Sequence, residues 1–309
     1  MYFPYFRGRQ YELLALKELA NGGLLGKRVF PVVEPVKLTT TFEETVRAFS
    51  NRNGFLALVF NPAVGDFGAT TTFIEEFWDK GFRISNKVVP AVIINTLADD
   101  TISTLVKNGV KKKDMIAFLD KRDSIEIYNA QFKKSGARFT LFPDERKISR
   151  SIKKGKIMFR DNFIRQQKNA DYPDDEFYTD DHLFFKEEGY AGFGDYSIIG
   201  NDYRETGFAP YAVAIHIIYF DSDNIMRVKH FISDSNEDTT NVAGKFSEAL
   251  TKLVEWYSEG QGKQETQALR TLLDYSMTDY YPGLPTIKKL TIMHHLELVG
   301  KHLDKESEK

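Results

Sequence analysis

Carboxylates, amides and basic side chains recur where short apolar runs of this chain end. Such groups can hold a divalent cation and a phosphate, or act as general acids and bases. The candidate catalytic residues are Glu34, Asp120, Asp161 and Asp195, and the candidate substrate-binding residues are Lys37, Arg160, Gly192 and Gly194. For any one of them, the alternative is that polar residues end strands because they make turns and cap helices.

The motif GFGD at 192–195 is the sharpest local pattern. Two glycines around Phe193 would let the backbone come close to a ligand, with Asp195 presented beside it. The spacing differs from the GxGxxG fingerprint of dinucleotide-binding proteins. The alternative is a bulge or tight bend in a strand.

Six apolar runs that end in a polar residue organise the chain. They lie at 29–35, 55–62, 88–96, 115–121, 138–145 and 156–162. Helical patterns separate them at a period of roughly 25 to 30 residues, which is typical of βα units and a parallel sheet. Because the strands of such a barrel aim their C-terminal ends at one opening, we expect the candidate residues to converge there.

Two further apolar runs, at 189–200 and 211–220, are interpreted as the seventh and eighth strands. The sequence therefore predicts an α/β fold, a (β/α)8 TIM-barrel-like domain over 1–260, with a C-terminal helical extension over 261–309. Before the first predicted helix, Arg7, Gly8 and Arg9 could approach an anion. The alternative is a strap across the bottom of the barrel.

The strand–helix rhythm breaks at 162–189, which we interpret as an insertion that forms a mobile lid over the barrel mouth. Its part 171–188 is mainly acidic, whereas the stretch 145–168 is basic and contains Phe159 and Phe163. The basic segment could contact nucleic-acid phosphates. Alternatively, it is a solvated helix face that pairs with the acidic lid.

Composition narrows the classes of protein. The chain has 309 residues, a formal net charge of −2 and no cysteine, which excludes disulfides, thiolate metal sites and cysteine nucleophiles. The start MYFPYFRGRQ lacks the pattern of a signal peptide, and no apolar run is long enough to span a membrane. These features predict a cytoplasmic protein without a membrane partner. HExxH, GxSxG and the P-loop motif are missing.

Three stretches carry a resemblance to a known family: YFPYFRGRQYELLAL, FGDYSIIGNDYRETGFAPYAVAIHIIYF and KHFISD. They resemble an uncharacterised bacterial family described as "beta family protein", whose genes often lie near phage-defence and mobile-element loci. The resemblance implies a barrel-like fold and a setting in antiviral defence. It transfers no catalytic residue.

Two hypotheses of different classes follow. In the first, the barrel binds a phosphate-containing or nucleic-acid ligand, such as a nucleotide, at the strand C-termini and could hydrolyse it with the help of a divalent metal. In the second, it is a non-catalytic barrel that binds a protein partner. The sequence leaves the cofactor, the oligomeric state and the enzymatic nature of the protein open.

Overall fold

The computed structural model describes residues 1–51, 54–68, 70–203, 209–260 and 264–307. The chain folds into two compact units, each interrupted once in sequence. The first comprises Met1–Asp161 and Asp181–Tyr196, and the second comprises Asn162–Asp180 and Ser197–Lys309. These boundaries differ from the predicted ranges 1–260 and 261–309. Residues 162–180 belong to the second unit, the chain then returns to the first unit for 181–196, and everything from residue 197 onward belongs to the second unit.

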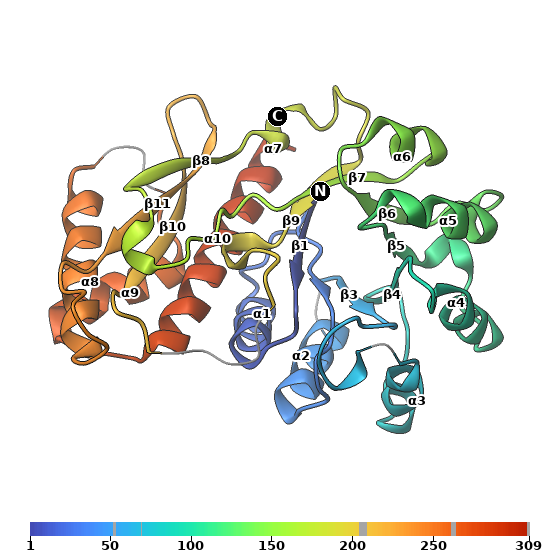
Figure 1. Ribbon diagram of the computed structural model, residues 1–309, viewed down its shortest axis with the longest axis horizontal. Coiled ribbons are helices and arrows are strands. Elements are labelled where there is room, and N and C mark those ends of the chain that lie inside the picture. Colours follow the sequence, from blue (N-terminus) through green and yellow to red (C-terminus); the bar gives the residue numbers. More distant parts are fainter. Residues whose placement is uncertain (52–53, 69, 204–208, 261–263, 308–309) are drawn as a thin grey trace. The chain divides into compact units, whose positions relative to one another are not determined.

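Within the described ranges, the first unit contains eight parallel strands that close into a barrel (Figure 1). In barrel order they are β1 (Tyr2–Phe6), β2 (Val32–Val33), β3 (Leu56–Val59), β4 (Val88–Ile93), β5 (Ile116–Phe118), β6 (Phe139–Phe142), β7 (Lys156–Arg160) and β9 (Gly192–Asp195). The predicted α/β fold of TIM-barrel type is confirmed.

Helices α1 to α6 each follow the barrel strand of the same number and surround the barrel (Figure 1). They are α1 (Gln10–Gly22), α2 (Thr40–Asn51), α3 (Thr72–Asp79), α4 (Ala98–Lys107), α5 (Ile125–Phe132) and α6 (Arg146–Ser151), and the short α7 (Asp181–Phe184) precedes β9. Gly23 ends the first helix, since it takes a φ of 66° directly after α1, a left-handed conformation that favours glycine.

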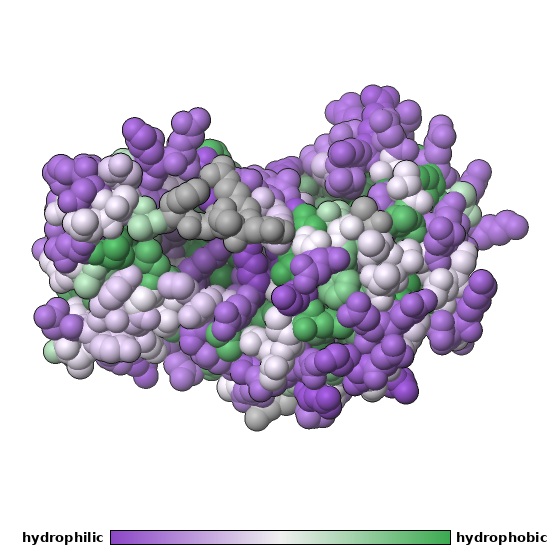
Figure 2. All heavy atoms as spheres, turned by 60° about the horizontal axis from the view of Figure 1, so that its bottom comes forward, coloured by the Kyte–Doolittle hydropathy of each residue, from purple (hydrophilic) through white to green (hydrophobic). Residues whose placement is uncertain are grey.

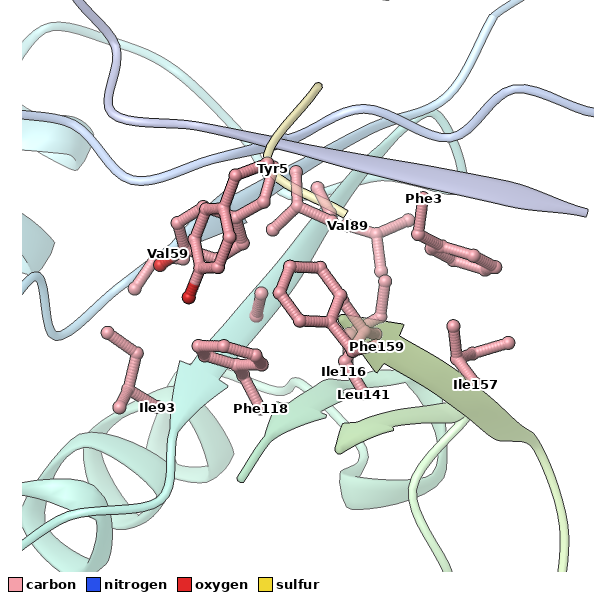
Figure 3. Packing of buried hydrophobic residues seen from close by; sticks show 14 residues of the cluster. Phe3, Tyr5, Val59, Val89, Ile93, Ile116, Phe118, Leu141, Ile157 and Phe159 are labelled. Atoms are coloured by element: carbon pink, nitrogen blue, oxygen red, sulfur yellow. The ribbon is translucent and has the colours of Figure 1, made fainter. Parts of the chain in front are cut away.

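The barrel interior is filled by side chains (Figure 3). On β1, for example, Phe3 and Tyr5 belong to this inner cluster, because alternate residues of a strand face the same side. Aromatic rings form the part of this cluster nearest the C-terminal ends of the strands. Tyr5 and Phe118 have ring centroids 5.1 Å apart, and Phe159 and Tyr196 have centroids 4.9 Å apart. The barrel is therefore a packed core that is closed below its mouth.

The strand that closes the barrel is not the predicted one. The first residues of the chain form β1, which pairs with β2 on one side and with β9 on the other, for example through Tyr2 and Phe193. The strap across the bottom of the barrel that was considered for Arg7, Gly8 and Arg9 is therefore wrong, because these residues follow the C-terminal end of β1. An apolar run of five residues sufficed for a strand because all five are buried.

The prediction that 211–220 forms the eighth strand of the barrel is wrong. Its residues form β10 (Ala214–Phe220), which pairs antiparallel with β11 (Met226–Ile232) in the second unit. The turn between them explains this pairing: the Oδ1 atom of Asp221 accepts hydrogen bonds from the backbone of Asp223 and Ile225, and Asn224 has a φ of 60°. A turn this short can join only antiparallel strands.

The segment 162–189 is not an irregular lid. Its middle forms β8 (Asp175–Thr179), the third strand of the antiparallel sheet, and its end forms α7 before β9. Tyr178 within it is almost fully buried. Since β8 is hydrogen-bonded along β11, this part of the segment is a structural element of the second unit.

Three helices complete the second unit: α8 (Val242–Ser258), α9 (Gln267–Thr278) and α10 (Leu284–Glu306). Helices α9 and α10 confirm the predicted C-terminal helical extension, whereas α8 lies within the range that was predicted to belong to the barrel domain. In the described part of the chain, we find no helix with the length and hydropathy that a membrane span requires. Figure 2 shows hydrophilic residues over most of the visible face, with smaller hydrophobic areas between them.

Candidate functional site

A buried ion pair lies at the C-terminal end of the first two barrel strands. Arg7 follows the inward-facing Tyr5 by two residues, and its guanidinium is bonded to the carboxylate of Glu34. The guanidinium carbon lies 5.3 Å from the ring centroid of Tyr5 and 5.5 Å from that of Tyr196. Arg7 is thus held by an anion and by two aromatic faces, which attract cations.

Glu34 is fully buried and accepts hydrogen bonds from three groups. Besides Arg7, the Tyr5 hydroxyl donates to its Oε2 atom at 2.8 Å, and the backbone N–H of Ala63 donates to its Oε1 atom at 2.6 Å. A buried carboxylate needs such partners to remain in the interior. Glu34 therefore joins β1, β2 and the loop after β3, and orients Arg7.

The loop after β1 passes close to the end of β2. Gly8 has a φ of 62°, and a side chain there would place its Cβ atom 3.0 Å from the carbonyl oxygen of Glu34. Only glycine takes this conformation at this distance without strain. The Arg7-Gly8 pair is therefore explained by the approach of the chain to Glu34.

Two exposed carboxylates lie at the same mouth. Asp120 and Asp161 follow the inward-facing Phe118 and Phe159 by two residues each, at the ends of β5 and β7. Burial raises the pKa of Tyr196, and the negative charges of Asp161, Glu34 and Asp120 raise it further, against the opposing charge of Arg7. Burial and then the Glu34 charge raise the pKa of Tyr5 as well. Both phenols therefore stay protonated around neutral pH.

Two asparagines complete the polar groups at this end. Asn61 is fully buried, accepts from the backbone N–H of Ile93 at 2.9 Å and donates to the Ile93 carbonyl at 2.7 Å. Its amide also donates to Asn95 Oδ1 at 3.0 Å. The side chain of Asn61 thus continues the β3–β4 ladder, and its role in this arrangement is structural.

Asp195 lies on the other face of the barrel wall. Its neighbour Tyr196 faces the interior, so Asp195 faces outward, where its Oδ1 atom accepts from the hydroxyl of Tyr2 at 2.7 Å. Tyr2 also stacks on Phe193, with ring centroids 5.1 Å apart. Asp195 is almost fully buried there and secures the closure of β1 against β9.

The glycines of GFGD face inward, and the lack of side chains there has a packing reason. A Cβ atom at Gly192 would clash with the carbonyl oxygen of Met1, and one at Gly194 would clash with that of Phe3. The motif therefore lets β9 lie close to β1, and ligand binding by these glycines stays a prediction.

Arg160 and Lys37 are at the periphery. Arg160 faces outward and is bonded to Asp181 Oδ1 at 2.9 Å and to Asp144 Oδ2 at 3.2 Å. Lys37 is 67% exposed and lies 3.8 Å from Asp66. Of the predicted residues, Glu34, Asp120 and Asp161 thus have charges that act on Tyr196, whereas Asp195 and Arg160 face outward.

The sequence-based site omitted Tyr5 and Tyr196, and Arg7 was considered only as a contact for an anion. Tyr5 and Arg7 follow the inward register of β1, and Tyr196, which directly follows β9, faces the same interior. The signal was the apolar run before the Arg-Gly pair, which has the same form as the other strand ends.

Within the described ranges, no three His, Asp or Glu side chains are grouped so that they could hold a metal ion. Comparisons of the chain with models of protein families, with curated proteins and with solved structures gave no match. The chemistry of the mouth therefore rests on its own residues: two exposed carboxylates, two protonated phenols and an arginine whose charge is balanced by Glu34.

Proposed function

We propose that this protein binds a nucleotide, free or within a nucleic-acid strand, at the C-terminal end of the barrel, as a component of a bacterial defence or mobile-element system. One observation carries the ligand class: the Arg7 guanidinium lies over Tyr5 and Tyr196, at a mouth where the negative charges of Asp161 and Asp120 act on Tyr196. Unpaired bases stack on aromatic rings and on arginine planes, and carboxylates accept hydrogen bonds from base amino groups. The defence setting rests on the resemblance described above.

The charges at the mouth favour an orientation in which the base of the nucleotide, and not its phosphate, lies between the carboxylates. Arg7 is neutralised by Glu34, and the two exposed carboxylates would repel a phosphate placed between them. A phosphate would instead lie toward the exposed Lys37 at the rim. If the ligand is hydrolysed, Asp120 or Asp161 is the candidate general base, since both are accessible whereas Glu34 is not.

Isothermal titration calorimetry with each of the common nucleoside 5′-monophosphates, with and without Mg²⁺, tests this proposal. Asp120→Asn and Asp161→Asn should each weaken binding by about 10-fold, because each lost carboxylate contact with a base is worth roughly 1–3 kcal/mol. Asp223→Asn, in the exposed turn between β10 and β11, is the matched control and should bind normally. Equal affinities of all three variants and the parent would contradict the proposal.

A second candidate function is a non-catalytic barrel that binds a protein partner. It is supported by Met277 and Tyr280 at the end of α9, whose exposed fractions are 82% and 57%. Tyr280 lines a groove of about 360 Å³ between α8 and α9 together with Phe246, and Met277 follows the lining residue Ser276 in the chain. If this candidate is right, Met277→Asp should abolish retention of a partner from the source cell and leave nucleotide binding unchanged. If Met277→Asp retains every partner that the parent retains, this candidate is refuted.

A further inference from the structure

A cavity lies at the end of the barrel opposite to the mouth. It has a volume of about 450 Å³ and opens among the loops that lead into β4, β5 and β6. Ligand pockets commonly measure roughly 300–1,000 Å³. The lining residues that could contact a polar or aromatic ligand include Trp78, Arg83, Asn86, Lys111, Asp114 and Arg138.

The lining of this basic cavity carries more positive than negative charge. Arg83, Lys111 and Arg138 stand against one carboxylate, that of Asp114, among the described lining residues. This is the reverse of the mouth, where Asp120 and Asp161 add negative charge. Because like charges repel, an anionic ligand should prefer the basic cavity.

Two of the cations are held in place by neighbouring groups. Arg83 donates from Nη1 to the carbonyl oxygen of Phe82 at 2.7 Å. The guanidinium carbon of Arg138 lies 5.7 Å from the ring centroid of Phe55 and 5.8 Å from that of Phe139. Fixed guanidinium groups lose little conformational entropy when they bind phosphate, for which their planar fork is suited.

The loop that carries Arg83 is itself ordered by hydrogen bonds. The Ser85 hydroxyl accepts from the backbone N–H groups of Lys87 and Val88, both at 3.1 Å, and the Ser85 N–H donates to the Val88 carbonyl. This turn presents Asn86 as a neutral polar group at the cavity. The wall is thus formed by a structured loop.

Trp78 supplies a flat apolar surface at the end of α3. It is partly exposed and lines the cavity together with the basic residues. Aromatic side chains beside a positively charged groove are the usual means of holding a nucleobase and its phosphate together.

We propose that the basic cavity is a second ligand site, which binds a nucleoside phosphate with its phosphate on Arg83, Lys111 and Arg138 and its base on Trp78. This site lies beyond the proposed function, which concerns the mouth at the other end of the strands. It would allow a nucleotide to bind the barrel at a place where none of the mouth residues takes part.

Tryptophan fluorescence tests this site directly. The chain contains two tryptophans, Trp78 and Trp256, so Trp256→Phe leaves Trp78 as the single reporter. Titration of this variant with adenosine 5′-monophosphate should give a saturable change in Trp78 emission. Arg83→Ala and Lys111→Ala should each weaken this binding by about 10-fold, as expected for the loss of one charge-assisted hydrogen bond to phosphate. Arg122→Ala, an exposed arginine before α5, is the matched control and should bind normally.

Two further measurements separate the alternatives. Asp114→Asn should tighten binding several-fold, because it removes the carboxylate from the wall. Inorganic phosphate should bind more weakly than the nucleotide, and equal affinity would refute the role of Trp78. The inference fails if Trp78 emission does not respond, or if Arg83→Ala and Arg122→Ala behave alike. It also fails if binding is lost only in Asp120→Asn and Asp161→Asn, a result that would support the mouth alone.

Discussion

Replacing Arg7 by methionine should destabilise the barrel unit substantially. The substitution keeps much of the side-chain volume but removes the cation bonded to the fully buried Glu34. Removing one partner of a buried ion pair typically costs about 3–5 kcal/mol. Because Tyr5 and Ala63 still donate to Glu34, we expect a loss near the lower limit, about 3 kcal/mol.

In a unit of this size, such a loss lowers the melting temperature by roughly 6–12 °C. Differential scanning calorimetry would measure it, and urea unfolding in the Trp256→Phe background would follow the barrel through Trp78. Glu34→Gln should cost less, about 1–2 kcal/mol, since the amide oxygen still accepts and Arg7 keeps some access to water. The double variant should be more stable than the sum of the single effects predicts, because the two groups interact.

The control for this experiment is Lys37→Met. Lys37 and Asp66 are both mostly exposed and lie 3.8 Å apart, so this change should stay within about 0.5 kcal/mol of the parent. If Arg7→Met also stayed within that range, or if the Arg7 and Glu34 effects were strictly additive, the ion pair would not be the element that fixes the mouth.

Two other outcomes follow from the buried polar groups. Asp195→Ala should lower stability by about 1–3 kcal/mol, because the buried hydroxyl of Tyr2 loses its acceptor, and unchanged urea unfolding would argue against an outward-facing Asp195. Burial lowers the pKa values of His216, His294 and His295 from 6.5 to about 3, 4 and 3. On acidification, these histidines therefore bind protons at a higher pH in the unfolded chain than in the folded one. The stability of the second unit should be full above pH 6.5 and should fall as the pH drops toward about 4, as Trp256 fluorescence would report. A flat profile across this window would refute that assignment.

The barrel was predictable because six of its strands are apolar runs buried on both faces, and such runs need no tertiary information to be recognised. The eighth strand was misassigned because β10 is equally apolar. Its partner β11 and the Asp221 turn show that it belongs to a hairpin. The sequence-based assignment gave more weight to reaching eight barrel strands than to this turn. The short β1 was overlooked because it has only five residues and because the polar residues after it were interpreted as an anion contact or a strap, although a (β/α)8 barrel begins with a strand before its first helix.

The candidate site was predictable only as far as strand ends are. Glu34, Asp120 and Asp161 have the inward register, so the end-of-strand rule found them. The same rule also selected Asp195 and Arg160, which lie one residue out of register and face outward. A shift of one residue moves a side chain to the other face of the wall, and apolar runs without alternation do not fix that register.

The pairing of β1 with β9 has a consequence for the order of folding. Tyr2 and Asp195, which hydrogen-bond across this seam, are 193 residues apart in the chain. Until residues 192–195 are made, the earlier strands can form only an open sheet with two unpaired edges, and such edges promote aggregation. Since distant contacts carry a large cost in loop-closure entropy, closure of this seam should be a late and slow step, during which a nascent chain depends on protection of both edges.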